Sequence, residues 1–346
     1  MINIDPNRSL SQGYTPHAHR TMSRQPSVGR IGIVGAGAMG STLAALLGDL
    51  MDIAIVCRNP RRAAEIIRNG VRTSGLFETS SRPIVVRSIA DLQNLGGVTV
   101  LFVTTKTTSI PAVAEELKPV LRRISQNRNG AFIVSFQNGI ESARELMGLL
   151  DYPRVLRMVL YIGATSPGQD GAVKITLDQP PHYIGTLDPA YRQTCYRIAS
   201  ILSSAGFHTC VASDIEKQVW RKGILNAATN PVCALVNANI DQALRSPART
   251  IVEALIAEGI AVATAHGVAL GEEYISHAYD ILEHARGHTP SMAEDIREHR
   301  KSEIGQLNRQ LIEHGRRMSI PTPTHEFVVA LIETLDAKID ALCTLS

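Results

Sequence analysis

The chain has 346 residues, 44% of them hydrophobic and 19% charged, and a formal net charge of +3. This length and composition are typical of a globular protein of about two domains with a substantial core. The basic residues form no concentrated block and the aromatic residues are scattered, so we expect no nucleic-acid partner. The most apolar long run, residues 251–270, contains Glu253, Glu258 and His266. We therefore expect a buried helix there and no membrane span.

Residues 1–28 are polar, rich in Ser, Pro and Arg, and lack the apolar segment of a secretory signal, so we expect a disordered tail. An Arg-rich N-terminus is also typical of a mitochondrial presequence, but Asp5, Pro6, Pro16 and Pro26 argue against an amphipathic targeting helix. The five cysteines have no close metal-ligand or redox spacing. We expect reduced thiols, a cytoplasmic location and no metal site.

Short apolar runs alternate with helical patterns from residue 29 to residue 212. The first four runs begin at residues 31, 52, 98 and 131, and they predict a parallel sheet covered by helices. Three further runs, which suggest strands closing this domain, begin at residues 155, 172 and 182. From residue 213 to residue 346, patterns of helical period replace the strand-like runs, over residues 214–237, 247–267, 271–286, 291–315 and 322–342. The sequence therefore predicts an α/β protein whose N-terminal parallel-sheet domain is followed by an all-helical C-terminal domain.

The first apolar run leads into a glycine motif. Gly35, Gly37 and Gly40 form G-x-G-x-x-G between the strand-like IGIV and a helical pattern. Gly35 permits a tight turn, Gly37 lets the backbone approach a pyrophosphate, and Gly40 allows close packing of helix on strand. A plain glycine turn is the alternative, but the strand–turn–helix context favours a dinucleotide site in a Rossmann-type domain. The predicted cofactor contacts in this turn are Gly35, Ala36, Gly37, Ala38, Met39 and Gly40.

The end of the second predicted strand indicates which dinucleotide is bound. An acidic residue there would accept hydrogen bonds from the ribose hydroxyls of NAD and repel a 2′-phosphate, whereas a guanidinium pairs with that phosphate. This chain has Arg58 at that point, followed by Arg61 and Arg62. We therefore expect NADPH, the alternative being that these arginines form a solvated helix N-terminus.

Reduction of a carbonyl also needs a proton donor and fixed hydrogen-bond donors around the developing alkoxide. A lysine can supply the proton when burial lowers its pKa toward neutrality. Lys222, Asn226 and Asn230 are four residues apart, so they line one stripe of a helix. Pro231 should bend or break the helix beside them, which predicts a pocket wall. The alternative is an exposed polar face, with Asn230 beginning a turn.

A second polar stretch begins at Ser291. With Glu294 this serine makes an S-x-x-E pattern, which predicts a capping box at a helix N-terminus. A helix N-terminus also suits a substrate carboxylate, so a binding role remains open beside the cap. Glu303 could belong to the same site or be a surface partner of Arg300 or His299.

Two more candidates follow predicted strands. Lys106 comes after the third run, and Gln137, Asn138 and Gly139 come after the fourth. The carboxyl ends of parallel strands face the ligand crevice, so both stretches are placed to contact cofactor or substrate. Loop lysines and Asn-Gly turns are also common for solvation and backbone geometry alone.

Together these blocks resemble the ketopantoate reductases, also called 2-dehydropantoate 2-reductases. The resemblance extends over nearly the whole chain after residue 29. It rests on GAGAMG at 35–40, Arg58, Lys106, QNG at 137–139, WRKxxxNxxxNP at 220–231 and SMxxDxxxxxxSE at 291–303. The last two blocks carry most of its specificity, because a generic Rossmann enzyme has neither.

The resemblance implies an NADPH-dependent reduction of ketopantoate to pantoate, on the route to coenzyme A. It implies that Lys222 is the general acid and that Glu303 supports the hydrogen-bond network of the active site. It implies that Arg58 binds the 2′-phosphate. The residues that it places against the substrate are Asn138, Asn226, Asn230 and Ser291; those that it places on the cofactor side of the cleft are Lys106, Asn138 and Glu303.

Some features depart from the family pattern. Gly223 follows the lysine where an apolar residue is usual, and residues 161–173 look more like paralogues that act on other substrates. An NADPH-dependent reductase of another 2-keto acid or of a biosynthetic carbonyl compound is therefore an alternative. A non-catalytic NADPH-binding regulator, which would not need the Lys222 stripe, is another. The expected partners are a small 2-keto acid and, because such apolar helices often hide a dimer surface, a second copy of the chain.

Overall fold

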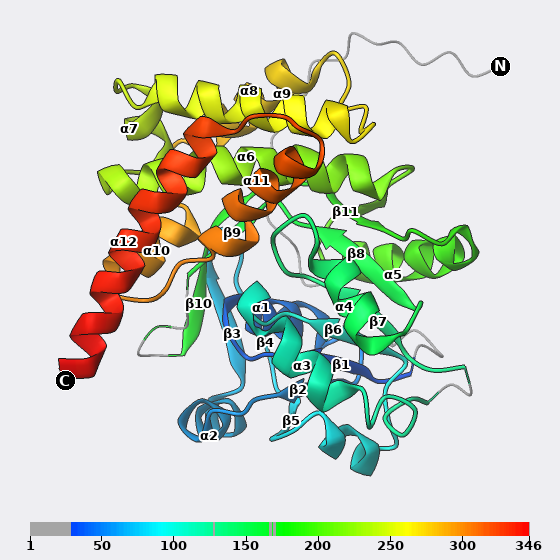
Figure 1. Cartoon of the computed structure of the whole chain (residues 1–346). Helices are drawn as coiled ribbons and strands as arrows, with labels where there is room; N and C mark the ends of the chain where they lie inside the picture. Colours follow the sequence, from blue (N-terminus) through cyan, green and yellow to red (C-terminus); the bar gives the residue numbers. More distant parts are fainter. Residues whose placement is uncertain (1–28, 127–128, 166–167, 169–170, 346) are drawn as a thin grey trace, which may run out of the picture.

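The computed structural model describes residues 29–126, 129–165, 168 and 171–345 (Figure 1). The predicted N-terminal tail, residues 1–28, lies outside the described residues. In Figure 1 most of the C-terminal helices, yellow to orange, lie above the N-terminal sheets, blue to green, and the last helix, in red, runs down beside them on the left. The predicted fold class, an α/β sheet part followed by an all-helical part, is confirmed.

The main sheet has eight strands in the order β12-β11-β8-β7-β6-β1-β2-β5. The first four predicted runs became the neighbouring strands β1, β2, β6 and β7, and all their pairings are parallel. Near the other edge β11 runs antiparallel to β8. The strands are β1 (Ile31–Val34), β2 (Ile53–Val56), β5 (Ile84–Val86), β6 (Val100–Val103), β7 (Phe132–Ser135), β8 (Val155–Val159), β11 (His182–Gly185) and β12 (Thr209–Val211). Because the chain leaves β1 toward β2 on one side and β6 lies on the other, the sheet has a topological switch point at β1.

Helices cover both faces of this sheet. Successive residues of the strands alternate between two apolar clusters, so that Ile33 and Phe102 belong to one and Val34 and Leu101 to the other. This period of two follows from the alternation of side chains along a strand. The helices are α1 (Ala38–Leu47), α2 (Pro60–Asn69), α3 (Ile110–Leu117), α4 (Ser142–Leu150) and α5 (Arg192–Ser204), with short 3-10 turns η1 (Ala90–Leu95), η2 (Thr107–Ser109) and η3 (Pro189–Tyr191).

A second, four-stranded sheet has the order β4-β3-β10-β9. Its strands are β3 (Val71–Gly75), β4 (Thr79–Ser81), β9 (Ile162–Ala164) and β10 (Ala172–Asp178). The apolar run that begins at residue 155 therefore supplies β8 to the main sheet and β9 to the second. The sequence analysis did not find β3 and β4, because they are short and polar and do not stand out as apolar runs.

The C-terminal part contains α6 (Ile215–Val236), α7 (Ile240–Leu244), α8 (Arg249–Ala265), α9 (Tyr274–His284), α10 (Ser291–Arg297), η4 (Ile304–Gln306), α11 (Asn308–Arg317) and α12 (Pro323–Leu345). Helix α6 is the centre of this part, and it packs against α8, α10 and α12. In the ranges that the structure describes, no helix is both long and apolar enough to cross a bilayer.

The prediction of one helix over residues 291–315 is wrong. The chain leaves helical geometry after Arg297, and His299 takes a left-handed conformation with φ of 53°. The backbone N–H and hydroxyl of Ser302 then bond to the carboxylate of Asp336, at 3.0 and 2.7 Å. The segment between α10 and α11 is therefore an anchored loop.

The sequence predicted that the helix bends or breaks beside Pro231, and a break is wrong, because α6 runs through this residue to Val236. Proline has no N–H, so the carbonyl of Ala227 loses its usual helical donor. The side-chain amide of Asn308 takes that place, and its Nδ2 lies 2.7 Å from the Ala227 oxygen. Asn308 is 0% exposed and its Nδ2 also lies 3.0 Å from Nδ1 of His325. A neighbouring helix thus closes the gap in α6.

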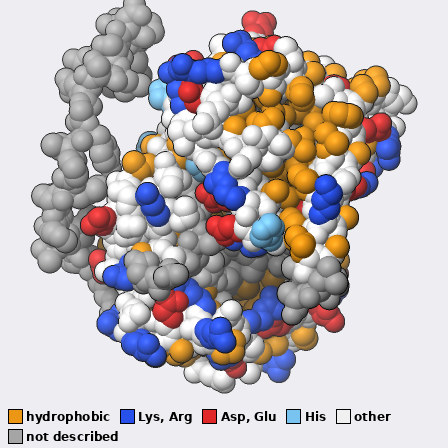
Figure 2. Space-filling model, turned by 90° about the vertical axis from the view of Figure 1, so that its left-hand side faces the viewer, with side chains coloured by type: hydrophobic (Ala, Val, Ile, Leu, Met, Phe, Trp, Pro, Cys, Tyr) orange, Lys and Arg blue, Asp and Glu red, His pale blue; other side chains and the backbone are white. Residues whose placement is uncertain are grey.

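Hydrophobic side chains gather in a patch on the upper half of the face shown in Figure 2. Three exposed hydrophobic residues, Phe327, Leu331 and Leu342, lie on α12. The expected homodimer stays a prediction, which sedimentation of the purified protein would test.

Candidate active site

The glycine motif forms a turn between β1 and α1. Gly35 has φ of 107°, a conformation that favours glycine, as the predicted tight turn requires. A Cβ on Gly37 would meet nothing within 4 Å, whereas one on Gly40 would lie 1.9 Å from the carbonyl oxygen of Gly35. Gly37 therefore leaves the N-terminus of α1 open to a ligand, and Gly40 allows the helix to pack on the turn. The first N–H groups of α1 have no partner within the helix, which suits a pyrophosphate.

A cavity of about 350 Å³ lies beside this turn. Its lining comes from the ends of β1 and β2, from α2 and from Thr105, and includes Arg58, Arg62 and Glu65. The side chain of Arg58 is 53% exposed, and its Nη1 is 3.9 Å from Glu116. Arg62 instead donates to the hydroxyl of Ser41 at 3.1 Å and pairs with Glu65 at 2.9 Å. Arg58 is therefore the arginine with the more available guanidinium, and the residues present fit a dinucleotide with an extra phosphate.

The loop after β6 contacts the helical part of the chain. Nζ of Lys106 lies 2.8 Å from Oδ2 of Asp295, which is 5% exposed. The backbone N–H of Thr107 donates to Oε1 of Glu303 at 2.8 Å, and its hydroxyl donates to the carbonyl of Asn138 at 3.1 Å. These bonds tie the ends of β6 and β7 to the segment from α10 to η4.

Glu303 is not a surface partner of its basic neighbours. Arg300 pairs with Asp295 at 2.8 Å and with Glu298, while the carboxylate of Glu303 bonds to Thr107. Burial raises the pKa of Glu303. The sequence analysis missed Asp295 as a functional candidate, although its place in SMxxD could have drawn attention to it.

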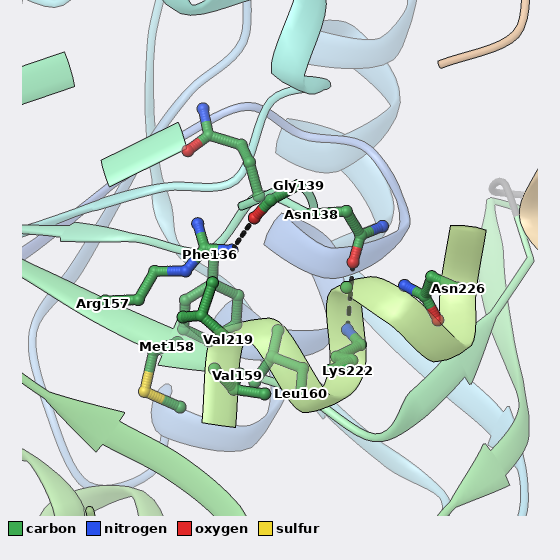
Figure 3. Close-up of a pocket in the computed structure, with 12 residues that line it drawn as sticks. Phe136, Asn138, Gly139, Arg157, Met158, Val159, Leu160, Val219, Lys222 and Asn226 are labelled. Atoms are coloured by element: carbon green, nitrogen blue, oxygen red, sulfur yellow. Dashed lines mark hydrogen bonds between the residues drawn. The ribbon is translucent and has the colours of Figure 1, made fainter. Parts of the chain in front are cut away.

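Lys222 lies on α6 and faces the loop after β7 (Figure 3). Its Nζ donates to Oδ1 of Asn138 at 3.0 Å. Burial lowers the pKa of Lys222 to about 7, and the nearby charge of Arg157 contributes to the same shift. A lysine of this pKa can release a proton near neutral pH.

The predicted substrate residues meet at one cavity of about 190 Å³. Its lining includes Asn138, Lys222, Asn226, Asn230 and Ser291. Asn230 is 6% exposed and lies within α6, so the alternative of an exposed face with a turn at this residue is wrong. Apolar side chains form much of the remaining wall, among them Tyr161, Leu177, Ile281 and Leu282.

The predicted capping box at Ser291 is not formed. Pro290 is the N-cap of α10, Ser291 is the first helical residue, and no side chain makes a capping hydrogen bond. Both Ser291 and Glu294 instead line the cavity. The serine hydroxyl is therefore available to a ligand.

Two family models match the chain over most of its length. The model described as "Ketopantoate reductase PanE/ApbA" matches residues 31–189, and "Ketopantoate reductase PanE/ApbA C terminal" matches residues 214–336. The chain belongs to the ketopantoate reductase family. This is a family of NAD(P)-dependent oxidoreductases that act on small keto acids.

Individual relatives are distant but span the same length. A 2-dehydropantoate 2-reductase from Archaeoglobus fulgidus is 24% identical over 90% of this chain and 99% of its own. A ketopantoate reductase structure from Ralstonia eutropha JMP134 has a TM-score of 0.79 at 24% identity, and the match covers 90% of this chain and 99% of that one. A D-mandelate dehydrogenase solved with NADH and anilino(oxo)acetate has a TM-score of 0.78 at 20% identity, with the same coverage. Proteins of this fold are thus named for different substrates, and the D-mandelate dehydrogenase was solved with NADH.

Proposed function

We propose that the protein is an NADPH-dependent reductase of a 2-keto acid, with the conversion of ketopantoate to pantoate as the first candidate reaction. The observation that carries this proposal is the Lys222–Asn138 hydrogen bond at a cavity lined also by Asn226, Asn230 and Ser291. Residues 29–212 would then form the cofactor domain and residues 213–346 the substrate and catalytic domain.

In this mechanism Lys222 donates a proton to the ketone oxygen as negative charge develops there. Its lowered pKa suits a donor that works near neutral pH. Asn138 orients the ammonium group through the 3.0 Å hydrogen bond. The side chains of Asn226, Asn230 and Ser291 hold the carboxylate and any hydroxyl of the substrate, because amide and hydroxyl donors satisfy an anionic acid without a second buried charge.

The cofactor is held by the glycine turn and by Arg58. When bound, NADPH supplies the hydride. The open N-terminus of α1 at Gly37 receives the pyrophosphate, and the Arg58 guanidinium pairs with the 2′-phosphate. Lys106 and Glu303 support the nicotinamide side by holding the loop after β6 against α10 and η4.

A second candidate is the reduction of a 2-keto acid with a bulkier apolar side chain. The apolar wall of the cavity favours it, as does the likeness to a D-mandelate dehydrogenase. A non-catalytic NADPH-binding regulator is less well supported, because it would have no use for a buried lysine in contact with an asparagine at the cavity.

The test is the oxidation of NADPH by purified protein with ketopantoate and, separately, with a panel of aliphatic and aromatic 2-keto acids. Turnover confined to ketopantoate supports the pantoate assignment. Faster turnover of an aromatic keto acid supports the second candidate. NADPH binding with no turnover of any keto acid contradicts the reductase.

The Arg58→Asp substitution should discriminate between the two dinucleotides. We expect NADPH binding to weaken about tenfold or more, because the 2′-phosphate loses a charge-assisted partner and meets a carboxylate instead. NADH binding should change little. The measurement is the Kd of each dinucleotide by fluorescence titration, with Arg61→Asp as the matched control, because Arg61 does not line the cavity. Equal weakening of both dinucleotides by the Arg58 change would refute this role.

A further inference from the structure

One buried cation next to the site takes no direct part in the proposed reaction. Arg157 lies on β8 and is only 8% exposed. Its Nη2 donates to the carbonyl of Gly139 at 2.7 Å, and its Nη1 donates to the hydroxyls of Ser135, at 3.2 Å, and Ser142. Among the described residues no carboxylate lies within ion-pairing distance of its guanidinium, and its Nε has no hydrogen-bond partner. A buried charge that no carboxylate contacts is costly, which calls for an explanation.

Arg157 and Lys222 line the same small cavity, together with Asn138 and Gly139. Figure 3 shows the two linked bonds, from Arg157 to Gly139 and from Lys222 to Asn138. Gly139 has φ of 91°, and a Cβ there would lie 2.6 Å from the carbonyl of Gln306, so the turn is held closely. The guanidinium therefore fixes the backbone next to the side chain that receives the lysine's hydrogen bond.

The charge of Arg157 has a second effect. Two cations beside one cavity repel each other, so each makes the protonated form of the other less favourable. Burial lowers the pKa of Lys222 most, and the Arg157 charge lowers it further. Burial also lowers the pKa of Arg157, to about 10, so it stays protonated at neutral pH.

We propose that Arg157 is a positioning residue for Lys222: its guanidinium holds the Asn138–Gly139 turn, and its charge makes the lysine ammonium a readier proton donor. This inference rests on the proposed function only in assuming that the proton of Lys222 goes to a keto acid substrate. The interaction itself concerns two side chains and can be tested without a substrate.

Other charged groups near the pair do not replace Arg157 in this role. His182 at the start of β11 is buried, which lowers its pKa, so its neutral form is favoured at neutral pH. Glu216 and Glu141 act on Arg157 from α6 and from the start of α4, and each already has a basic partner. Those partners are Arg144 and His314. Besides Lys222, the titratable side chains that line the proposed substrate cavity are Tyr161, His288 and Glu294.

The experiment measures the protonation of Lys222 in the full-length protein. Brief labelling with acetic anhydride across a pH series, followed by peptide mass spectrometry, gives the midpoint of Lys222 reactivity, with the exposed Lys118 as internal reference. We expect a midpoint near 7 in the unmodified protein. Arg157→Gln, which keeps a donor but no charge, should raise this midpoint by about one pH unit. Arg157→Lys, which keeps a cation for as long as the new lysine is protonated, should raise it by less.

An unchanged midpoint in a folded Arg157→Gln protein would overturn the proposal, as would a midpoint at the ordinary lysine value in the unmodified protein. If Arg157→Gln does not fold, the test uses the unmodified protein and Arg157→Lys. A Lys222 midpoint at the ordinary lysine value in an Arg157→Lys protein whose new lysine is still protonated also contradicts the proposed role of Arg157. Absence of keto acid turnover would count against the proposed function and leave this labelling result intact.

Discussion

Replacing Lys222 by methionine is expected to lower kcat for keto acid reduction by about 10²–10⁴-fold, the usual contribution of a positioned general acid. Methionine keeps most of the apolar volume of the lysine and removes the proton donor. NADPH binding should be unchanged, because Lys222 does not line the cavity beside the glycine turn. The measurements are steady-state turnover and a fluorescence titration with NADPH.

Lys217→Met is the matched control, since this lysine lies on the same helix and lines neither of the two larger cavities. It should retain activity. A Lys222→Met protein with normal turnover would remove Lys222 from the mechanism.

The pH dependence of the unmodified protein has a defined sign. A general acid must be protonated to act, so the rate of reduction should be high below a pKa of about 7 for Lys222 and fall as the pH rises through it. Single-turnover rates, measured with saturating substrate and NADPH over a pH series, report this fall in the rate of reduction. A rate that stays constant from pH 6 to about 9 would contradict a lysine donor of the expected pKa.

Replacing Asn308 by leucine is expected to lower the free energy of unfolding by about 1–3 kcal/mol for each acceptor that it leaves without a donor. The two acceptors are the carbonyl of Ala227 and Nδ1 of His325. Both lie in the helical core, where water cannot readily replace the lost bonds. Urea unfolding, followed by far-UV circular dichroism, measures the loss.

A double-mutant cycle with Pro231→Ala separates the two acceptors. Alanine supplies the N–H that the Ala227 carbonyl lacks, so Asn308→Leu should cost less in the Pro231→Ala protein than in the unmodified one. An equal cost in both backgrounds would show that Asn308 does not compensate for the proline. Stability is measured here and not activity, because a change at Pro231 would also affect its neighbour Asn230, a proposed substrate ligand.

Local patterns in the sequence predicted the elements that depend on local contacts. The glycine turn at Gly35, the parallel strands on either side of β1 and the long helix that carries Lys222 follow from apolar runs and helical period. The Lys222–Asn230 stripe was found because residues four apart share a helix face. The family resemblance placed Asn138 beside it, although 84 residues separate Asn138 from Lys222.

Contacts between distant segments could not be predicted in this way. Nothing near Pro231 in the sequence indicates that Asn308 will donate to the Ala227 carbonyl, so a bend or a break in this helix was the expectation. Arg157 is hidden in a strand whose other residues are apolar, and its partners come from β7, α4 and the Gly139 turn. The anchoring of Ser302 by Asp336, which interrupts the predicted long helix, likewise needs α12 in place.

The ion pair of Lys106 with Asp295 and the hydrogen bond of Thr107 with Glu303, together called the polar clasp, bear on how proteins of this fold diverge. These two bonds join the loop after β6 to the helical part, while the apolar wall contributed by α9 consists of other residues, Ile281 and Leu282. Substitutions in that wall can change which keto acid fits without disturbing the clasp or the dinucleotide turn. The same fold can thus serve small aliphatic and aromatic acids by changes in one wall of the cavity.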